Sequence, residues 1–327
     1  MARTLFARGS RGWLVGRIQS ALADHKLYTA RIDNDFGALT EGAVMSFQKA
    51  RNAPATGRVD EITWTALLNE PLLTLFQRCL QLTSYFEGHG FTRAAGNWDG
   101  AGLTWGIIGF TLKFGKVQKI LLEAVQREPA AVRAALVGLN DDLLRILGVP
   151  LNDQMAWADS ISESPKKHLL REPWRSAFVR LGELPLVRKI QLSLAYDDYF
   201  VPALATARRY NLSSEQGVAL CFDIHVQNGG IEKQDAAAIA AGLPSLPPGD
   251  EQALRVLIAN SVADHAKLEF REDTRSRKLA IAAARAPFAA LASPSTPGAS
   301  ANSPPPSLDF SFLLLPVFFR ASFSTLA

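Results

Sequence analysis

Residues 82–110 read LTSYFEGHGFTRAAGNWDGAGLTWGIIGF and place two carboxyl groups, those of Glu87 and Asp99, in one short segment. The preceding residues predict an amphipathic helix, because apolar or small side chains recur every three to four positions. These positions are Leu72, Leu75, Phe76, Cys79, Leu80 and Thr83. Continuing the stripe by four residues reaches Glu87, so we expect this carboxyl group on the inward face at the end of the helix.

The two carboxyl groups are expected to differ in their surroundings. Burial disfavours the charged form of Glu87 and raises its pKa, so the protonated acid can donate to a leaving oxygen. Asp99 lies among Gly96, Gly100 and Gly102, where it should stay solvated and ionised and able to activate water. One dry and one wet carboxyl group is the arrangement that hydrolysis of a glycosidic bond requires. The competing interpretation is an ordinary helix-end acid followed by a turn-forming Asp-Gly pair.

The pattern Ser84-x-x-Glu87 followed by Asp99-Gly-x-Gly-x-Thr104-x-Gly-Ile-Ile-Gly-Phe110 resembles the catalytic core of the chitosanases of glycoside hydrolase family 46, which are relatives of the lysozymes. This resemblance implies a mainly α fold, a two-lobed lysozyme-like α+β domain with a short β region. It also implies that Glu87 is the proton donor, that Asp99 is the general base, and that Thr104 helps to hold the attacking water. Such a pair would invert the anomeric configuration, with the carboxyl groups about 6.5–9.5 Å or more apart.

The N-terminal part has its own pattern of helices and turns. Val15, Ile18 and Leu22 fit one helix, 32–37 forms a tight turn, and Thr40 is expected to cap a second helix. The motifs I-D-N-D-F-G-x-x-T-x-x-A-V-x-x-F-Q and G-R-V-D-x-x-T-W-x-x-L resemble the three-helix peptidoglycan-binding module of bacterial and phage cell-wall enzymes. A bland three-helix spacer is the alternative. From the resemblance, the residues assigned to the wall-binding module are Asp33, Phe36, Thr40, Gln48 and Trp64.

We divide the chain into a peptidoglycan-binding module at 1–69, a chitosanase-like or lysozyme-like catalytic domain at 70–285, and a tail at 286–327. The catalytic domain should be mostly helical with a β-turn-β region around 97–111, and the polar stretch 150–172 is expected to form a loop over a cleft. Residues 286–307 are rich in Ala, Ser and Pro, which predicts a disordered linker. The apolar segment 308–327 is too short and broken to span a bilayer.

A second group of residues is expected to support the acid. The segment 216–229 resembles the central buried helix of the family, where an Asp at the position of Asp223 pairs with Arg behind the catalytic acid. Arg277 is the best-matching partner, and a surface ion pair is the alternative. His265 falls near the place of the family's other Arg.

Other chemistries fit the sequence less well. Cys79 and Cys221 lie in apolar helical patterns, which favours buried thiols over a disulfide or a catalytic nucleophile. The five His residues show no zinc-binding spacing, and Gly100, Gly102 and Gly106 do not follow a βαβ strand. We therefore expect no metal and no cofactor.

The composition of the chain indicates which classes of binding partner are unfavourable. A net charge of +4 is too small to indicate nucleic-acid binding, and no apolar run is long enough for a transmembrane span. We expect a monomer. No Sec signal peptide is visible, so we expect the protein to reach the periplasmic or extracellular cell wall by lysis, as endolysins do, or by dedicated secretion.

The charge of the chain indicates which polysaccharide is the substrate. Chitosan is a polycation that suits an acidic cleft, whereas this chain is basic and has Ala101 and Lys116 where the family commonly has Arg and an acid. We therefore expect cleavage of the β-1,4 bonds of peptidoglycan, with chitosan as the close alternative. A non-catalytic cell-wall-binding protein is the alternative from another class.

Overall fold

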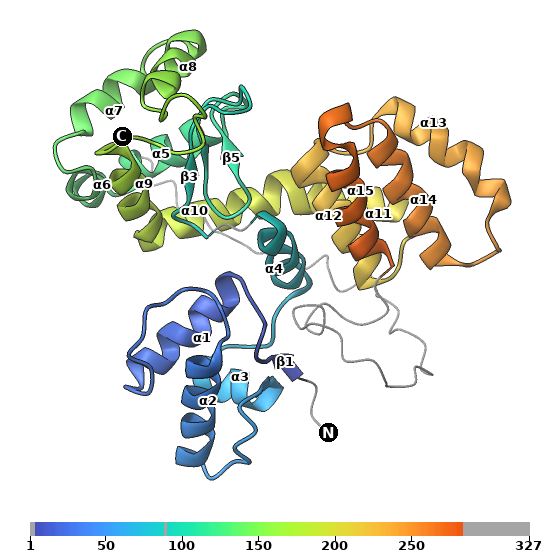
Figure 1. Ribbon diagram of the computed structural model, residues 1–327, viewed down its shortest axis with the longest axis horizontal. Coiled ribbons are helices and arrows are strands. Elements are labelled where there is room, and N and C mark those ends of the chain that lie inside the picture. The colour runs from blue at the N-terminus through green and yellow to red at the C-terminus, as the bar shows by residue number, and fades with distance from the viewer. Residues whose placement is uncertain (1–3, 88–89, 284–327) are drawn as a thin grey trace, which may run out of the picture.

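The computed structural model describes residues 4–87 and 90–283, except for the side chains of residues 85–87. It is mostly helical, with small sheets, as the sequence predicts. Figure 1 shows helix α4 (Leu75–Glu87) at the centre of the molecule, with helices on several sides. Every other element can be placed by its position relative to this helix.

The N-terminal unit lies on one side of α4 (Figure 1). Its helices are α1 (Trp13–Asp24), α2 (Ala38–Ala50) and α3 (Glu61–Leu68). Strand β1 (Thr4–Phe6) pairs antiparallel with β2 (Val59–Asp60). The apolar positions predicted for the first helix, Val15, Ile18 and Leu22, are all buried.

A second group of elements, here called the sheet lobe (residues 90–183), follows α4. The expected β-turn-β region is a three-stranded antiparallel sheet in the order β3-β4-β5. Its strands are β3 (Ala94–Ala95), β4 (Thr104–Trp105) and β5 (Phe110–Thr111). The helices of the lobe are α5 (Lys116–Arg127), α6 (Pro129–Leu136), α7 (Asn140–Leu147), α8 (Leu151–Ser160) and α9 (Trp174–Glu183).

The expectation of an irregular loop over 150–172 is wrong for its first part, because residues 151–160 form α8. Few apolar side chains signal this helix, yet Ala158 is fully buried and Gln154 donates to the Val149 carbonyl oxygen at 2.9 Å. The irregular remainder packs against the loop that carries Asp99, since Gly96 N donates to the His168 carbonyl oxygen at 3.3 Å.

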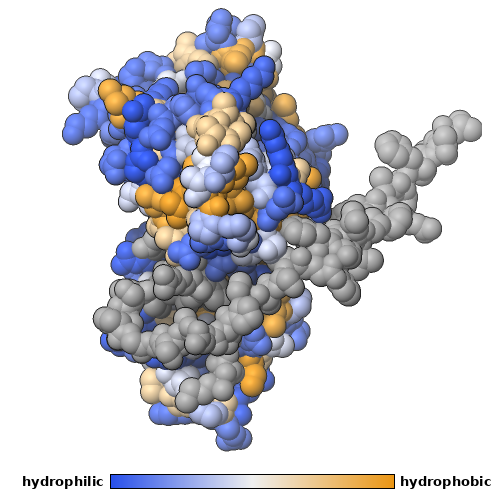
Figure 2. All heavy atoms as spheres, turned by 90° about the vertical axis from the view of Figure 1, so that its right-hand side faces the viewer, coloured by the Kyte–Doolittle hydropathy of each residue, from blue (hydrophilic) through white to orange (hydrophobic). Residues whose placement is uncertain are grey.

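The chain crosses to a C-terminal lobe (residues 201–282) through α10 (Pro185–Ala195) and the π-helical segment η1 (Tyr196–Phe200). This lobe lies on the opposite side of α4 from the sheet lobe (Figure 1). Seen from its own side, its face is largely hydrophilic, with a smaller apolar area (Figure 2). Its elements are α11 (Val201–Arg209), α12 (Glu215–Asn228), α13 (Lys233–Gly242), η2 (Leu243–Ser245), α14 (Glu251–Asp264), η3 (Leu268–Phe270) and α15 (Arg271–Ala282).

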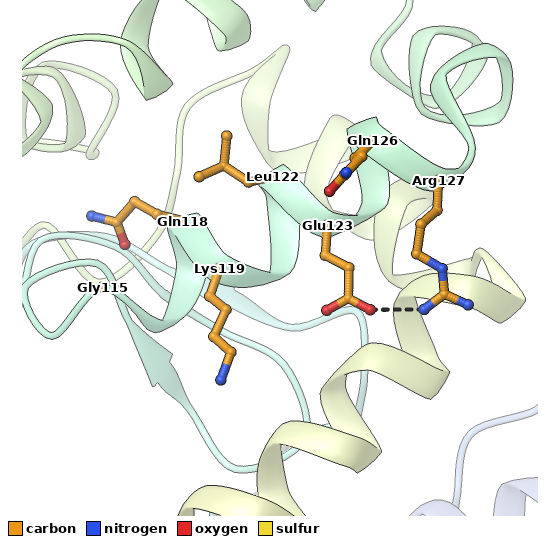
Figure 3. A pocket seen from close by; sticks show the side chains of 7 residues that line it. All are labelled: Gly115, Gln118, Lys119, Leu122, Glu123, Gln126 and Arg127. Atoms are coloured by element: carbon orange, nitrogen blue, oxygen red, sulfur yellow. Dashed lines mark hydrogen bonds and ion pairs between the residues drawn. The ribbon is translucent and has the colours of Figure 1, made fainter. Parts of the chain in front are cut away.

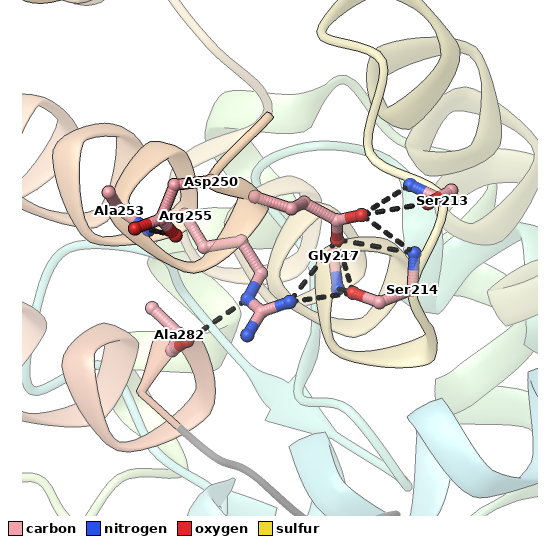
Figure 4. A network of polar contacts seen from close by, with 8 residues as sticks. Ser213, Ser214, Gly217, Asp250, Ala253, Arg255 and Ala282 are labelled. Atoms are coloured by element: carbon pink, nitrogen blue, oxygen red, sulfur yellow. Dashed lines mark hydrogen bonds and ion pairs between the residues drawn. The ribbon is translucent and has the colours of Figure 1, made fainter. Parts of the chain in front are cut away.

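A buried polar network fixes the start of α12 in this lobe (Figure 4). Glu251 accepts hydrogen bonds from Ser213 N at 2.9 Å and from Ser214 N at 3.2 Å. Arg255 is buried and donates both to Ser214 Oγ at 2.7 Å and to the Ala282 carbonyl oxygen at 3.0 Å. The network joins α14, the end of α15 and the first turn of α12, and so fixes the helix that carries Asp223.

Cys79 and Cys221 are both buried free thiols, as expected. Burial raises the pKa of both thiols, that of Cys221 to about 12, so neither is a thiolate at neutral pH. Among the described residues, no cluster of His, Cys, Asp and Glu could hold a metal ion. No helix in the same ranges is long and apolar enough to cross a membrane.

Candidate active site

Asp99 lies in the loop between β3 and β4 and is exposed. Its Oδ1 accepts a hydrogen bond from Ala101 N at 3.0 Å, which orients the carboxylate within the turn. Gly100 and Gly102 both have a positive φ, 79° and 81°, so the turn requires the conformational freedom of glycine. The solvated setting expected for Asp99 is the one that the structure shows.

The loop is anchored from behind by Asn97. Its side-chain amide donates to Asp159 Oδ1 at 3.0 Å, and its Oδ1 accepts from Gly102 N at 2.9 Å. Its own backbone N–H donates to Ser162 Oγ at 2.9 Å. Asp159 also pairs with Lys167 at 2.5 Å, and hydrogen bonds from Lys167 and Asn97 lower the pKa of its carboxyl group. These contacts hold Asp99 on a rigid turn.

Thr104 begins β4, directly after this loop. It is half-buried and pairs with Ala95 on one side and Thr111 on the other. The next residue but one, Gly106, has φ 91°, and a Cβ atom there would lie 2.4 Å from Gln191 Oε1. Gln191 accepts a hydrogen bond from Ile107 N at 3.0 Å, so α10 holds the strand that positions Thr104.

A cavity of about 400 Å³ lies between Asp99 and the C-terminal lobe. Its far wall is built from the ends of α12 and α14 and from the starts of α13 and α15. The lining side chains besides Asp99 are Gln227, Asn228, Glu232, Gln234, Asp235, Val262, His265, Ala266, Lys267, Phe270 and Thr274. Asp99 therefore faces a furrow between two lobes.

Sequence reasoning missed the polar residues of the far wall. Asp235 is buried and bonds to His265 Nδ1 at 2.7 Å, and its other oxygen accepts from Glu232 N at 2.9 Å. Asp235 thereby fixes both His265 and the start of α13. The segment 232–235 carries a capping box, a signal that predicts a helix start but not a cavity.

Glu87 is the last residue of α4, and its side chain lies outside the described residues. The raised pKa and the distance to Asp99 therefore stay predictions. The helix itself is described, and Thr83, one turn before Glu87, is fully buried, as the predicted stripe requires. The stripe fixes which face of α4 packs inward, but its first position is wrong, because Leu72 precedes the helix and is 44% exposed.

Asp223 and Arg277 form a buried ion pair behind α4. Arg277 Nη2 lies 2.7 Å and its Nε lies 2.9 Å from Asp223 Oδ1, and Thr83 Oγ1 of α4 lies 3.4 Å from the same oxygen. Asp223 is 0 % exposed, which excludes the alternative of a surface pair.

Lys278, which the sequence analysis did not single out, is a second cation on Asp223. It is fully buried, and its Nζ lies 3.1 Å from Asp223 Oδ2 and 2.8 Å from Gln227 Oε1. Burial raises the pKa of Asp223, but Lys278 and Arg277 outweigh this effect and hold it below its ordinary value. His265, which falls near the place of the family's second cation, instead lines the cavity with Asp235.

The module residues are placed differently from the catalytic ones. Phe36, Thr40, Gln48 and Trp64 are buried, so these side chains belong to the interior of the N-terminal unit and do not form a surface for a polymer. Asp33 is exposed and accepts from Gln19 Nε2 at 2.7 Å.

The expectation that Thr40 caps α2 is wrong, because the helix begins at Ala38 after Gly37. The Thr40 hydroxyl is instead used by the 33–37 turn. It accepts from Gln19 Nε2 at 3.1 Å and donates to the Asp35 carbonyl oxygen at 3.4 Å. Asn34 has the positive φ of 63° that its place in the motif requires.

A second hollow runs along α5 (Figure 3). It is lined by Gly115, Gln118, Lys119, Leu122, Glu123, Gln126 and Arg127. Glu123 pairs with Arg127 at 2.7 Å, and Lys119 lies 3.7 Å from Asp198. Asp198 also pairs with Lys116 at 2.5 Å, so each charged side chain named here has a partner of opposite charge.

The comparison with family models agrees with the resemblance of the N-terminal part. Residues 11–67 match the family described as "Putative peptidoglycan binding domain". The predicted N-terminal module is confirmed. No curated protein sequence matches the chain.

Solved structures similar to the chain include chitosanases. The GH46 chitosanase GsCsn46A of Gynuella sunshinyii, in complex with chitotetraose, is 19% identical, with a TM-score of 0.47, over 64% of this chain and 86% of that chain. The native chitosanase of Bacillus subtilis MY002 is 20% identical, with a TM-score of 0.45, over 63% of this chain and 84% of that chain.

Proposed function

We propose that the chain is a cell-wall-targeted glycoside hydrolase that cleaves β-1,4 bonds of an amino-sugar polysaccharide. Its catalytic domain spans 70–285 and its module 1–69. The observation that carries the proposal is the exposed Asp99, held by a rigid loop at the edge of a furrow between two lobes. A polysaccharide cleft needs an ionised carboxylate at such a place.

In the proposed mechanism, Glu87 protonates the glycosidic oxygen and Asp99 takes a proton from water. Thr104 follows the Asp99 loop on β4, and it helps to orient that water. The water attacks the anomeric carbon on the face opposite the leaving group, which inverts the configuration. The buried Asp223 cluster touches α4 through Thr83 and fixes the helix that ends at Glu87.

Peptidoglycan is the substrate that the architecture favours. The module holds the enzyme on an insoluble glycan and raises the local concentration of the catalyst there. The basic net charge of +4 suits a wall that carries carboxylates.

Chitosan is the second candidate, and the furrow itself favours it. Asp99, Glu232 and Asp235 outnumber the cationic Lys267 along its walls, and His265 adds a charge only when it is protonated. Acids in the furrow would attract the ammonium groups of a glucosamine polymer.

A zymogram of the purified protein on peptidoglycan and on chitosan, followed by mass analysis of the fragments, tests this proposal. Cleared zones and fragments cut between sugars support it, and the gel that clears identifies the polymer. Fragments cut in the peptide bridges of peptidoglycan, or no clearing on either gel together with retained wall binding, would contradict it. The second of these results would favour a non-catalytic wall-binding protein.

A further inference from the structure

The start of α1 in the N-terminal module lies against α4, which ends at Glu87. Leu14 N donates to Gln81 Oε1 at 3.1 Å, and Gln81 Nε2 donates to the carbonyl oxygen of Arg11. Gly12 makes this approach possible, because a Cβ atom there would lie 2.4 Å from Gln81 Nε2. Gln81, which lies six residues before Glu87 on α4, thus binds the backbone at the start of α1.

A second contact leads from the module to the sheet behind Asp99. Trp13 is buried and meets Phe91 edge to face, with ring centroids 5.9 Å apart and an interplanar angle of 79°. The Phe91 carbonyl oxygen accepts from Gln191 Nε2 at 3.1 Å, and Gln191 Oε1 accepts from Ile107 N at 3.0 Å. Ile107 lies between β4 and β5. The module therefore contacts Phe91, and Phe91 binds Gln191, the residue that holds this sheet.

The connection between α3 and α4 is also fixed. Trp64 Nε1 donates to the Pro71 carbonyl oxygen at 3.2 Å, and Arg17 of α1 pairs with Glu70. A flexible tether would have a solvated backbone and few contacts with its neighbours. This connection is short and bound to the module that it follows.

We propose that the docked module is part of the scaffold of the active site, with Gln81 and Trp13 as positioning residues. The module contacts α4, which ends at Glu87, and it is linked through Phe91 and Gln191 to the turn after β4, the strand that follows the Asp99 loop and carries Thr104. This inference rests on the proposed function. It gives the module a role in hydrolysis that is separate from wall binding. A module that positions the catalytic groups affects the hydrolysis of every substrate, including substrates that the module does not bind.

A soluble oligosaccharide of the polymer that the zymogram identifies, too short to reach the module, separates positioning from tethering. The variants are Gln81→Met, which removes the amide but keeps the bulk, and Trp13→Ala, with Trp13→Phe as the conservative rescue. The matched control is Leu39→Ala, since Leu39 is 70% exposed on α2. Small misplacements of catalytic groups are costly, so we expect kcat to fall about tenfold in the first two variants with KM little changed.

Hydrogen exchange of peptides covering 75–87 and 104–111 gives a readout that does not depend on activity. We expect faster exchange in both peptides for Gln81→Met and Trp13→Ala, and wild-type exchange for Trp13→Phe and Leu39→Ala. Binding of Gln81→Met to purified sacculi should match that of the wild type, which shows that the module is still folded.

Unchanged kcat and unchanged exchange in Gln81→Met and Trp13→Ala would overturn the inference and leave the module as a tether. An inactive wild-type protein would overturn the proposed function instead. In that case the exchange measurement alone still decides whether the module orders α4.

Discussion

Lys278 Nζ lies 3.1 Å from Asp223 Oδ2, an oxygen that also accepts from Arg277 Nε at 3.2 Å, and both Lys278 and Asp223 are fully buried. Two cations thus share one buried carboxylate behind α4. Removing the carboxylate would leave both cations without this partner in a dry interior. Breaking this cluster should therefore cost more stability than breaking an exposed ion pair elsewhere in the described residues.

The first prediction concerns this cluster. Asp223→Ala should lower the free energy of unfolding by about 3–5 kcal/mol, the usual cost of removing one partner of a buried ion pair. Urea denaturation measures the change. The control is Asp142→Ala, because Asp142 is 60% exposed in its pair with Arg145 and should cost about 0.5 kcal/mol or less. Equal decreases in the free energy of unfolding for the two variants would show that the buried cluster stabilises the fold no more than a surface ion pair does.

The second prediction concerns the loop behind Asp99. Asn97→Ala removes the side-chain contacts to Asp159 and Gly102 and leaves the loop free to shift. We expect kcat to fall about 10- to 100-fold, since misplacement of about 1 Å is enough for such a loss. Steady-state kinetics on the preferred glycan measures it. Asn140→Ala, at the half-buried start of α7, is the control. A wild-type kcat in Asn97→Ala would mean that the loop holds its shape without this side chain.

The third prediction concerns pH. Burial lowers the pKa of His225 below its ordinary value of 6.5, so the folded state binds a proton less readily than the unfolded chain. The contribution of His225 to stability is therefore complete above pH 6.5 and is lost as the pH falls below it. We expect the Tm difference between wild type and His225→Gln to shrink or change sign from pH 7.5 to pH 5.5. A pH-independent difference would contradict this assignment.

The fourth prediction concerns the module. The Gln19 side chain bonds to Asp33, Thr40 and the backbone of the 33–37 turn from a fully buried position. Gln19→Leu removes these bonds, and each buried group left unsatisfied costs about 1–3 kcal/mol, so the turn and wall binding should be lost. Sedimentation with purified sacculi measures binding. The surface variant Leu39→Ala should preserve the fold of the module, as its far-UV circular dichroism and Tm will show.

The fifth prediction concerns stereochemistry. If Asp99 activates water opposite the leaving group, the first product carries the inverted anomeric configuration. Proton NMR recorded within the first minutes of hydrolysis distinguishes the two anomers before they equilibrate. Retention would exclude Asp99 as the base and would indicate a covalent intermediate.

Local patterns were sufficient to predict much of the architecture. The stripe from Leu75 to Thr83 marked the buried face of α4, and the glycines around Asp99 marked a loop that needs positive φ. The helix α8 was missed because its buried contacts come from Gln154 and Ala158, which give no apolar period. Thr40 was misassigned because a threonine near a helix start serves equally well in the preceding turn.

The far wall of the furrow could not be read from the sequence. Glu232 and Asp235 come from the start of α13 and His265 from the end of α14, and only the packing of these helices brings them opposite Asp99. Lys278 was missed for a similar reason, because a lysine in a charged helix is usually solvated. Only the packing of α15 against α12 and α14 shows that Lys278 is buried.

The most direct test of the central claim is the rate of hydrolysis of the preferred glycan by Asp99→Asn and Glu87→Gln, measured as released reducing ends beside sacculus binding. Each carboxyl group takes part in proton transfer, so each variant should lose about 10²–10⁴-fold in kcat or more while wall binding stays at the wild-type level. A wild-type rate in either variant would show that the acid and base lie elsewhere.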